Sequence, residues 1–110
     1  EDTGNLPPLK EMYEMVARTY KESPSEIAKE CKAIEQRLRR ALSAGLTNLA
    51  SIGLTDYGNP KFEHYAPLYF DFEDVRLKMK EIEQGKETGK VKVNIKKFLQ
   101  VLYLELQEGH

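Results

Sequence analysis

The residues from Ser23 to Ala44 constrain the fold more than any other stretch, because their pattern is that of one long amphipathic helix. The stretch opens with Ser23 and Pro24, a serine that can cap free N–H groups and a proline that fits the first helical turn. Glu26, three residues after the serine, completes the pattern of a capping box. On a helical wheel, the apolar side holds Ile27, Cys31, Ile34, Leu38, Ala41 and Leu42. The opposite side holds Lys29, Lys32, Gln36, Arg39 and Arg40.

An anchored helix with a cationic outer side suits a long, rigid and negative partner such as DNA, although a charged row on a helix is usually only solvated. The pattern of residues 23–44 alone leaves both interpretations open. The formal net charge of −1 counts against DNA binding, because nucleic-acid-binding domains are often strongly basic. The charge is unevenly distributed, however, since residues 23–44 hold five Lys and Arg against three Glu, and those glutamates lie away from the centre of the basic row.

Apolar residues at three- and four-residue spacing predict a first helix from Leu9 to Tyr20. Only Lys21 and Glu22 separate this helix from the cap at Ser23, and so short a connection predicts the crossing geometry of a helix-turn-helix. Ala17 would lie where the two helices approach. The wedge that sets their crossing angle would consist of Val16, Tyr20 and Ile27.

Beyond Ala44, the helix either continues to about Ile52 or breaks at Gly45 and resumes, with Gly53 as its natural end. Loop residues follow, and then a short helix is expected from Asn59 or Pro60 to Ala66, stopped near Pro67. Asp71 would cap a helix over residues 72–84. The inner side of that helix would consist of Phe72, Val75, Met79 and Ile82.

A loop is expected at residues 85–93, with a short strand at Val91–Val93 as its one regular element. Asn94 would cap a last, broadly apolar helix from Ile95 to about Gln107. Together the elements predict an all-α, compact bundle of five or six helices that contains a helix-turn-helix and occupies residues 9–107. Residues 1–8 are interpreted as a linker remnant and residues 108–110 as a remnant of expression.

The sequence contains no motif for catalysis, for a metal or for a cofactor, so we expect a binding module and not an enzyme. The single cysteine, Cys31, excludes an intrachain disulfide. No apolar run approaches the roughly 20 residues that span a bilayer, so we expect no membrane partner and a cytoplasmic location.

Two further groups of residues have an open interpretation. Six of the ten aromatic residues lie between Tyr57 and Phe72, where we expect core packing, with any exposed remainder forming a dimer surface. A second cationic cluster could contact a phosphate backbone from the side, or could simply be solvated. It consists of Lys86, Lys90, Lys92, Lys96 and Lys97.

Several strings resemble the output domain of YcbB-type response regulators. They are Lys32–Leu42, Leu46–Leu54, Asp56–Tyr57, Phe62–Ala66 and Phe70–Met79. The resemblance covers about residues 10–105. It implies the DNA-binding half of a two-component system of bacilli and their relatives, associated with glutamine sensing and uptake, with a receiver domain N-terminal to it.

A fainter resemblance is to the effector domain of the sporulation master response regulator, in two registers. Residues 16–27 can be laid on its helix-turn-helix, or residues 34–42 on the body of its recognition helix. The two registers differ in which turns reach the bases.

We therefore predict a DNA-binding output domain that regulates transcription of nitrogen- or glutamine-related genes, as a homodimer on two half-sites of promoter DNA. The candidate DNA-contacting residues span both registers: Lys21, Ser23, Ser25, Lys29, Lys32, Gln36, Arg39 and Arg40. The alternative is a helical interaction or dimerisation module without DNA binding, which would act through the aromatic segment and the last helix.

Overall fold

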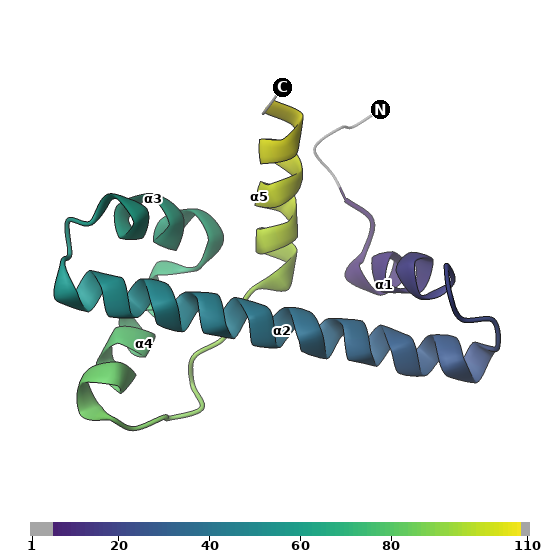
Figure 1. Ribbon diagram of the computed structural model, residues 1–110, viewed down its shortest axis with the longest axis horizontal. Helices are drawn as coiled ribbons and strands as arrows, with labels where there is room; N and C mark the ends of the chain where they lie inside the picture. The colour runs from purple at the N-terminus through teal and green to yellow at the C-terminus, as the bar shows by residue number, and fades with distance from the viewer. Residues whose placement is uncertain (1–5, 109–110) are drawn as a thin grey trace.

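The computed structural model describes residues 6–108 and contains, within them, five α-helices and no strand (Figure 1). The helices are α1 (Leu9–Ala17), α2 (Pro24–Thr55), α3 (Pro60–Tyr69), α4 (Phe72–Gln84) and α5 (Ile95–Glu108). The all-α prediction is therefore confirmed. Residues 1–5 of the predicted linker and residues 109–110 of the predicted remnant lie outside the described residues, whereas Glu108 is the last residue of α5.

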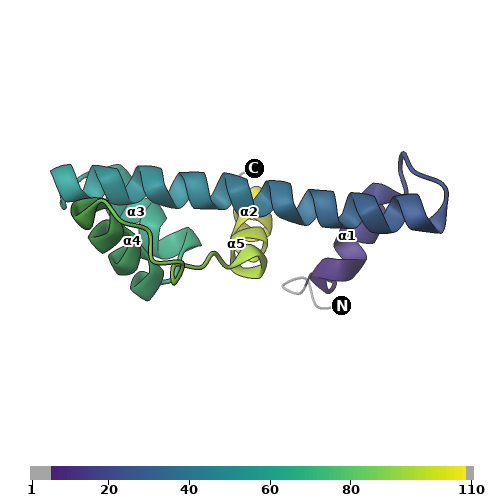
Figure 2. The ribbon, with the colours of Figure 1, turned by 90° about the horizontal axis from the view of Figure 1, so that it is seen from below.

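The helix α2 runs the whole length of the molecule (Figure 1). Its 32 residues correspond to about 48 Å at 1.5 Å per residue, and the largest extent of the molecule is 47 Å. Along this axis α1 lies beside the N-terminal half of α2, and α3 and α4 lie beside its C-terminal half. Figure 2 shows α3, α4 and α5 on one side of α2, so much of the opposite side is uncovered.

The start of α2 has a local cause, whereas its middle and its end were less well predicted. The Ser23 hydroxyl accepts the Glu26 N–H at 3.2 Å, and Pro24 is the first helical residue, which confirms the predicted start. The helix passes Gly45 without a break, so the continuous alternative is the correct one. The predicted end at Gly53 is wrong, because α2 continues to Thr55.

Gly53 does not mark the end of a helix. Its lack of a side chain allows a close approach between α2 and α3. A Cβ at Gly53 would lie 2.5 Å from Cε1 of Phe62, whose ring packs directly on the α2 backbone. This contact belongs to a core in which Leu46 is completely buried. The other buried members of that core are Leu42, Phe62, Ala66, Phe70, Val75 and Ile95.

The end of α1 differs from its prediction. The helix ends at Ala17 and not at Tyr20, because the N–H groups of Thr19 and Tyr20 bond three residues back, as in a turn. Residues 18–23 therefore connect α1 to α2, and the predicted two-residue connection is wrong. Ala17 is fully buried, as expected at a close approach, but Val16 and Tyr20 are about half exposed, so the predicted wedge does not form.

The predicted stop of the next helix near Pro67 is also wrong, because α3 continues to Tyr69. Proline removes the N–H that would bond the carbonyl of Glu63. Both Pro67 and Glu63 are exposed, so water can solvate that carbonyl and the helix tolerates the loss. The start of α3 follows its sequence, since the Asn59 side chain accepts the N–H of Lys61 at 2.9 Å.

The prediction for α4 is correct in its bounds and partly wrong in its details. Asp71 precedes the helix but makes no side-chain cap; its carboxylate accepts the Lys97 ammonium at 3.3 Å instead. Phe72, assigned to the inner side, is 61% exposed, with the Arg76 guanidinium over its ring. The buried side of α4 includes Glu81, which the apolar pattern did not reveal.

The chain between α4 and α5 is extended, and the predicted strand at Val91–Val93 is absent from the described residues. The Lys92 N–H donates to the Asp74 carboxylate at 3.1 Å, which fastens this segment to α4. At its end, the Asn94 side chain accepts the Lys97 N–H at 3.0 Å, so the predicted cap of α5 is confirmed.

The buried Glu81 carboxylate organises the first part of the same connection. It accepts the Thr88 hydroxyl and, at 2.8 Å, the Thr88 N–H, and the Lys78 ammonium lies 2.9 Å away. The Thr88 hydroxyl, Lys78 and the Thr88 N–H together lower the pKa of Glu81 to about 2. The charged carboxylate is therefore the form that the fold requires.

We predict opposite effects for alanine at the two glycines within α2. Gly53→Ala should destabilise the fold by about 1–3 kcal/mol, because the new methyl group collides with the Phe62 ring. Gly45→Ala should stabilise it by up to about 1 kcal/mol, because the nearest atom to its Cβ is 4.0 Å away and alanine favours a helix. Urea denaturation followed by circular dichroism measures both changes; equal effects at the two positions would contradict the close approach at Gly53.

The contacts of the Glu81 carboxylate with Thr88 and Lys78 predict that the fold becomes less stable at acidic pH. Because the folded pKa of Glu81 is about 2 and the unfolded value is about 4.3, its contribution is present above pH 4–5 and is lost as the pH falls towards 2. Glu81→Gln should therefore lower the melting temperature at pH 7 and have little effect at pH 2. The exposed Glu83→Gln is the matched control; a pH profile unchanged by Glu81→Gln would show that Glu81 does not fasten this connection.

Candidate nucleic-acid interface

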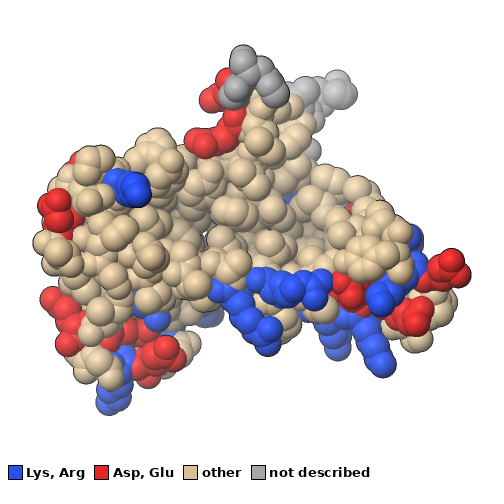
Figure 3. All heavy atoms as spheres, in the orientation of Figure 1, with Lys and Arg blue, Asp and Glu red and all other residues tan. Residues whose placement is uncertain are grey.

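The predicted cationic residues lie together on the N-terminal half of α2. Lys29, Lys32, Gln36, Arg39 and Arg40 are all exposed, and we call them the cationic face. Figure 3 shows Lys and Arg side chains in a row along the lower edge of the molecule. The row lies over the N-terminal half of α2, beside which α1 packs. The structure therefore confirms that these side chains share one exposed surface.

One residue of the cationic face forms an ion pair. The Arg39 guanidinium lies 2.8 Å from the carboxylate of Glu35, one turn earlier, which was expected to lie away from the centre of the basic row. In residues 6–108, no ion pair involves Lys29, Lys32 or Arg40. The face thus presents three unpaired cations and one arginine shared with a carboxylate.

The remaining candidate residues fall into two groups. Ser25 is exposed in the first turn of α2, and it follows the three- and four-residue spacing of Lys29 and Lys32. Ser23 lies off this row, and its hydroxyl is used by the helix cap. Lys21 is half-buried in the connection before α2, so the structure does not bring it into the row.

The side of α2 next to the cationic face contacts α1. Tyr13 of α1 and Ala28, Cys31 and Glu35 of α2 line a shared cavity of about 440 Å³, and Lys32 of the cationic face lies at its edge. The Tyr13 hydroxyl is buried without a hydrogen-bond partner among the described residues, and burial is the main cause of its raised pKa. Cys31 is half-buried here, as expected for the apolar side of the helix. α1 therefore anchors α2 and leaves the cationic face open.

A second polar cluster was missed by the sequence reasoning. The Glu30 carboxylate accepts the Tyr20 hydroxyl and the Arg37 guanidinium, both at 2.7 Å. The bond from Tyr20, followed by that from Arg37, lowers the pKa of Glu30, and the same bond raises the pKa of Tyr20. The signal was the seven-residue spacing of Glu30 and Arg37, which is two helical turns. This cluster fastens the α1–α2 connection to α2.

Two lysines of the second cationic cluster have structural contacts. The Lys97 ammonium donates to the Phe70 carbonyl at 3.0 Å as well as to Asp71, so it joins the start of α5 to the α3–α4 corner. The Lys96 ammonium donates to the Pro7 carbonyl at 3.4 Å. The other three lysines of the cluster are exposed on the connection between α4 and α5.

Searches for other kinds of site gave negative findings for the described part of the chain. Nowhere in residues 6–108 do three or more His, Cys, Asp or Glu side chains gather as they would around a metal ion. None of the five helices combines the length and the apolar character needed to cross a membrane.

Comparison with known proteins places this chain in a family. The YcbB domain matches residues 1–102. Over 90 residues the chain is 46% identical to the transcriptional regulatory protein GlnL of Bacillus subtilis (strain 168), an alignment that covers 80% of this chain and 29% of GlnL. The chain thus spans less than a third of the length of this relative. No solved structure gives a significant match. From the match over nearly all of its residues, we conclude that the chain belongs to the YcbB domain family.

Proposed function

We propose that this domain binds double-stranded promoter DNA through the cationic face of α2, as the output domain of a transcriptional regulator. The observation that carries the proposal is the cationic face itself, an exposed row on a continuous helix that α1 meets only at the edge, beside Lys32. The name of the relative GlnL, a transcriptional regulatory protein, supports the same function.

The length of α2 limits how it can meet DNA. Lys29 and Arg40 are eleven residues apart, about 16 Å along the helix, whereas the major groove is about 12 Å wide. The row therefore cannot lie crosswise in the groove over its full length. We propose that Ser25, Lys29, Lys32 and Gln36 approach the base edges, while Arg39 and Arg40 contact phosphates farther along. Phosphate contacts would supply salt-dependent affinity, and base contacts would supply sequence preference.

In this proposal α1 and α2 act as a helix-turn-helix unit whose connection is residues 18–23. The Glu30 cluster and the Ser23 cap would hold that connection in place. The domain would work in the cytoplasm with a receiver domain of the same full-length chain, and as a homodimer on two half-sites. The length of GlnL, of which this chain covers 29%, is consistent with such further domains.

Protein interaction without DNA binding is the second candidate function. It is favoured by a specific observation, the apolar surface formed by α2, α3 and α5. The two functions make different predictions for the cationic face, because an interaction module would not need it.

Removing Arg39 and Arg40 tests the DNA interface directly. Arg39→Ala with Arg40→Ala should weaken binding to all DNA sequences and reduce the slope of log affinity against log salt by about two, one for each lost phosphate contact. Fluorescence anisotropy with DNA from upstream of the encoding operon, titrated at several salt concentrations, measures both quantities.

The matched control removes two positive charges from a different surface of the domain. Lys61→Ala with Lys80→Ala changes two exposed lysines of α3 and α4 and should leave affinity and slope close to the original values. If the arginine and lysine pairs have equal effects, the cationic face is not the DNA-binding surface.

The Glu35–Arg39 pair predicts a gain of affinity. Glu35→Gln removes a negative charge from the edge of the cationic face and releases Arg39, and an exposed pair of this kind is weak enough to be exchanged for a phosphate contact. We expect DNA binding to tighten by about twofold to fivefold at low salt. The exposed Glu63→Gln in α3 is the control with the same change of charge, and weaker binding by Glu35→Gln would contradict the proposed role of Arg39.

A further inference from the structure

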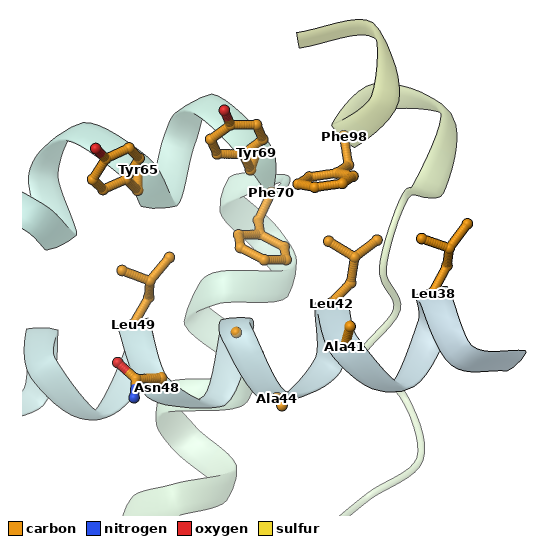
Figure 4. Close-up of a pocket in the computed structure, with 11 residues that line it drawn as sticks. Leu38, Ala41, Leu42, Ala44, Asn48, Leu49, Tyr65, Tyr69, Phe70 and Phe98 are labelled. Atoms are coloured by element: carbon orange, nitrogen blue, oxygen red, sulfur yellow. The ribbon is translucent and has the colours of Figure 1, made fainter. Parts of the chain in front are cut away.

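An apolar groove lies where α2, α3 and α5 meet (Figure 4). Its volume is about 630 Å³, and no charged residue lines it. Ala41, Gly45 and Asn48 form part of its floor on α2, and the rings of Tyr65, Tyr69 and Phe98 line it from α3 and α5. Tyr65 is 42% exposed although it stacks on Tyr69, so the groove exposes part of the aromatic segment. A large open groove without charge is unusual on a monomeric surface.

The helix beside the groove is itself only partly covered. α5 projects from the middle of α2 (Figure 1), and of its residues only Ile95 is fully buried. Leu104 and Leu106 are 44% and 63% exposed near its free end. A helix with apolar residues around most of its surface is normally buried against another element. The same chain therefore carries both an apolar groove and an uncovered apolar helix.

We propose that a second copy of this chain covers the groove, with the α5 helices of the two copies antiparallel and each seated in the groove of the other. A two-fold dimer requires one self-complementary patch, and a groove beside a projecting helix supplies both halves of such a patch. This inference specifies the surface of the dimer in the proposed function, and it does not depend on which residues of α2 meet DNA.

The charges on α5 favour the antiparallel arrangement. Lys96 and Lys97 lie in its first turn, where Lys97 also pairs with Asp71, and Glu105 and Glu108 lie in its last turn, where Glu105 also accepts the Tyr69 hydroxyl and no basic residue is present. In an antiparallel pair, the acidic end of each helix lies beside the basic end of the other. A parallel pair would instead place like charges side by side.

The position of the patch also suits a dimer. On α2, the groove extends to Ala44, one helical turn beyond Arg40, whereas Lys29 lies about 22 Å before Ala44 along the helix. A partner in the groove would therefore lie next to Arg40 and leave Lys29 and Lys32 uncovered.

Sedimentation equilibrium over a range of protein concentrations tests the dimer. We expect the 110-residue chain to dimerise, and Leu106→Glu or Ala44→Glu to raise the dissociation constant at least tenfold. Both positions are exposed, so the variants should keep the helical circular dichroism of the parent. Phe72→Glu is the control, because its side chain is 61% exposed and lies outside the groove. A chain that stays monomeric up to millimolar concentration, or a control that is equally disruptive, would overturn the proposal.

Disulfide trapping tests the antiparallel geometry. In a Cys31→Ser background, Val101→Cys places a thiol near the middle of α5, where the two copies meet close to the symmetry axis, and mild oxidation should join them. Leu106→Cys should not react in this way, because antiparallel packing separates the two thiols by about 14 Å along the helices, beyond the reach of a disulfide. Cross-linking through Leu106→Cys alone would exclude this arrangement.

DNA binding separates a failure of this inference from a failure of the proposed function. The Leu106→Glu variant should bind a single half-site with the affinity and salt slope of the parent, while losing its advantage on a two-site DNA. Loss of single-site binding by this folded variant would contradict the assignment of the groove to a second copy.

Discussion

The burial of one side of α2 by three shorter helices is the interaction on which the rest of the structure depends. Leu46 is completely enclosed at the centre of that contact, and Phe62 packs so closely on Gly53 that no side chain fits between them. Because this core holds the C-terminal half of α2 in place, the helix can extend beyond it as a straight element. The cationic face, and the surface that α1 contacts, therefore lie on the part of α2 that extends beyond the core.

The extent of the cationic face is set by how much of the N-terminal half of α2 is covered by α1. α1 packs on the side that carries Ala28 and Cys31, where its own Tyr13 is buried. Glu35 lies at the edge of that contact and draws Arg39 towards it. The surface offered to a polyanion is thus limited on this flank by the α1 contact and by the Glu35 carboxylate, and the net charge of the chain does not describe it.

Local patterns predicted the features that depend on nearby residues. The caps at Ser23 and Asn94, the helical spacing of the apolar residues in α2 and the shared row of exposed residues all follow from periodicity and hydrogen bonding within a few residues. The strings that resemble the YcbB family agree with the match over residues 1–102.

The errors arose where a distant contact overrides a local preference. Gly53 signals a helix end, yet the ring of Phe62 explains its presence inside α2. Tyr20 fits an apolar stripe, yet its hydroxyl is bound by Glu30, ten residues away. Glu81 is polar but buried, because its carboxylate is satisfied by Lys78 in the same helix and by Thr88 in the connection that follows. For the same reason the apolar groove could not be seen in the sequence, since it is assembled from three helices.

The uneven support of α2 has a consequence for its motions. The buried residues of this helix, from Leu42 onwards, all lie in the half that carries the core, whereas its first turns rely on the Ser23 cap and on contacts with α1. Local opening is easiest where few apolar contacts are lost. A single helix therefore has two stabilities, and backbone amides near Lys29 and Lys32 should exchange with solvent well before those around Leu46. The part of the molecule offered to a partner is also the part that a partner can make more rigid.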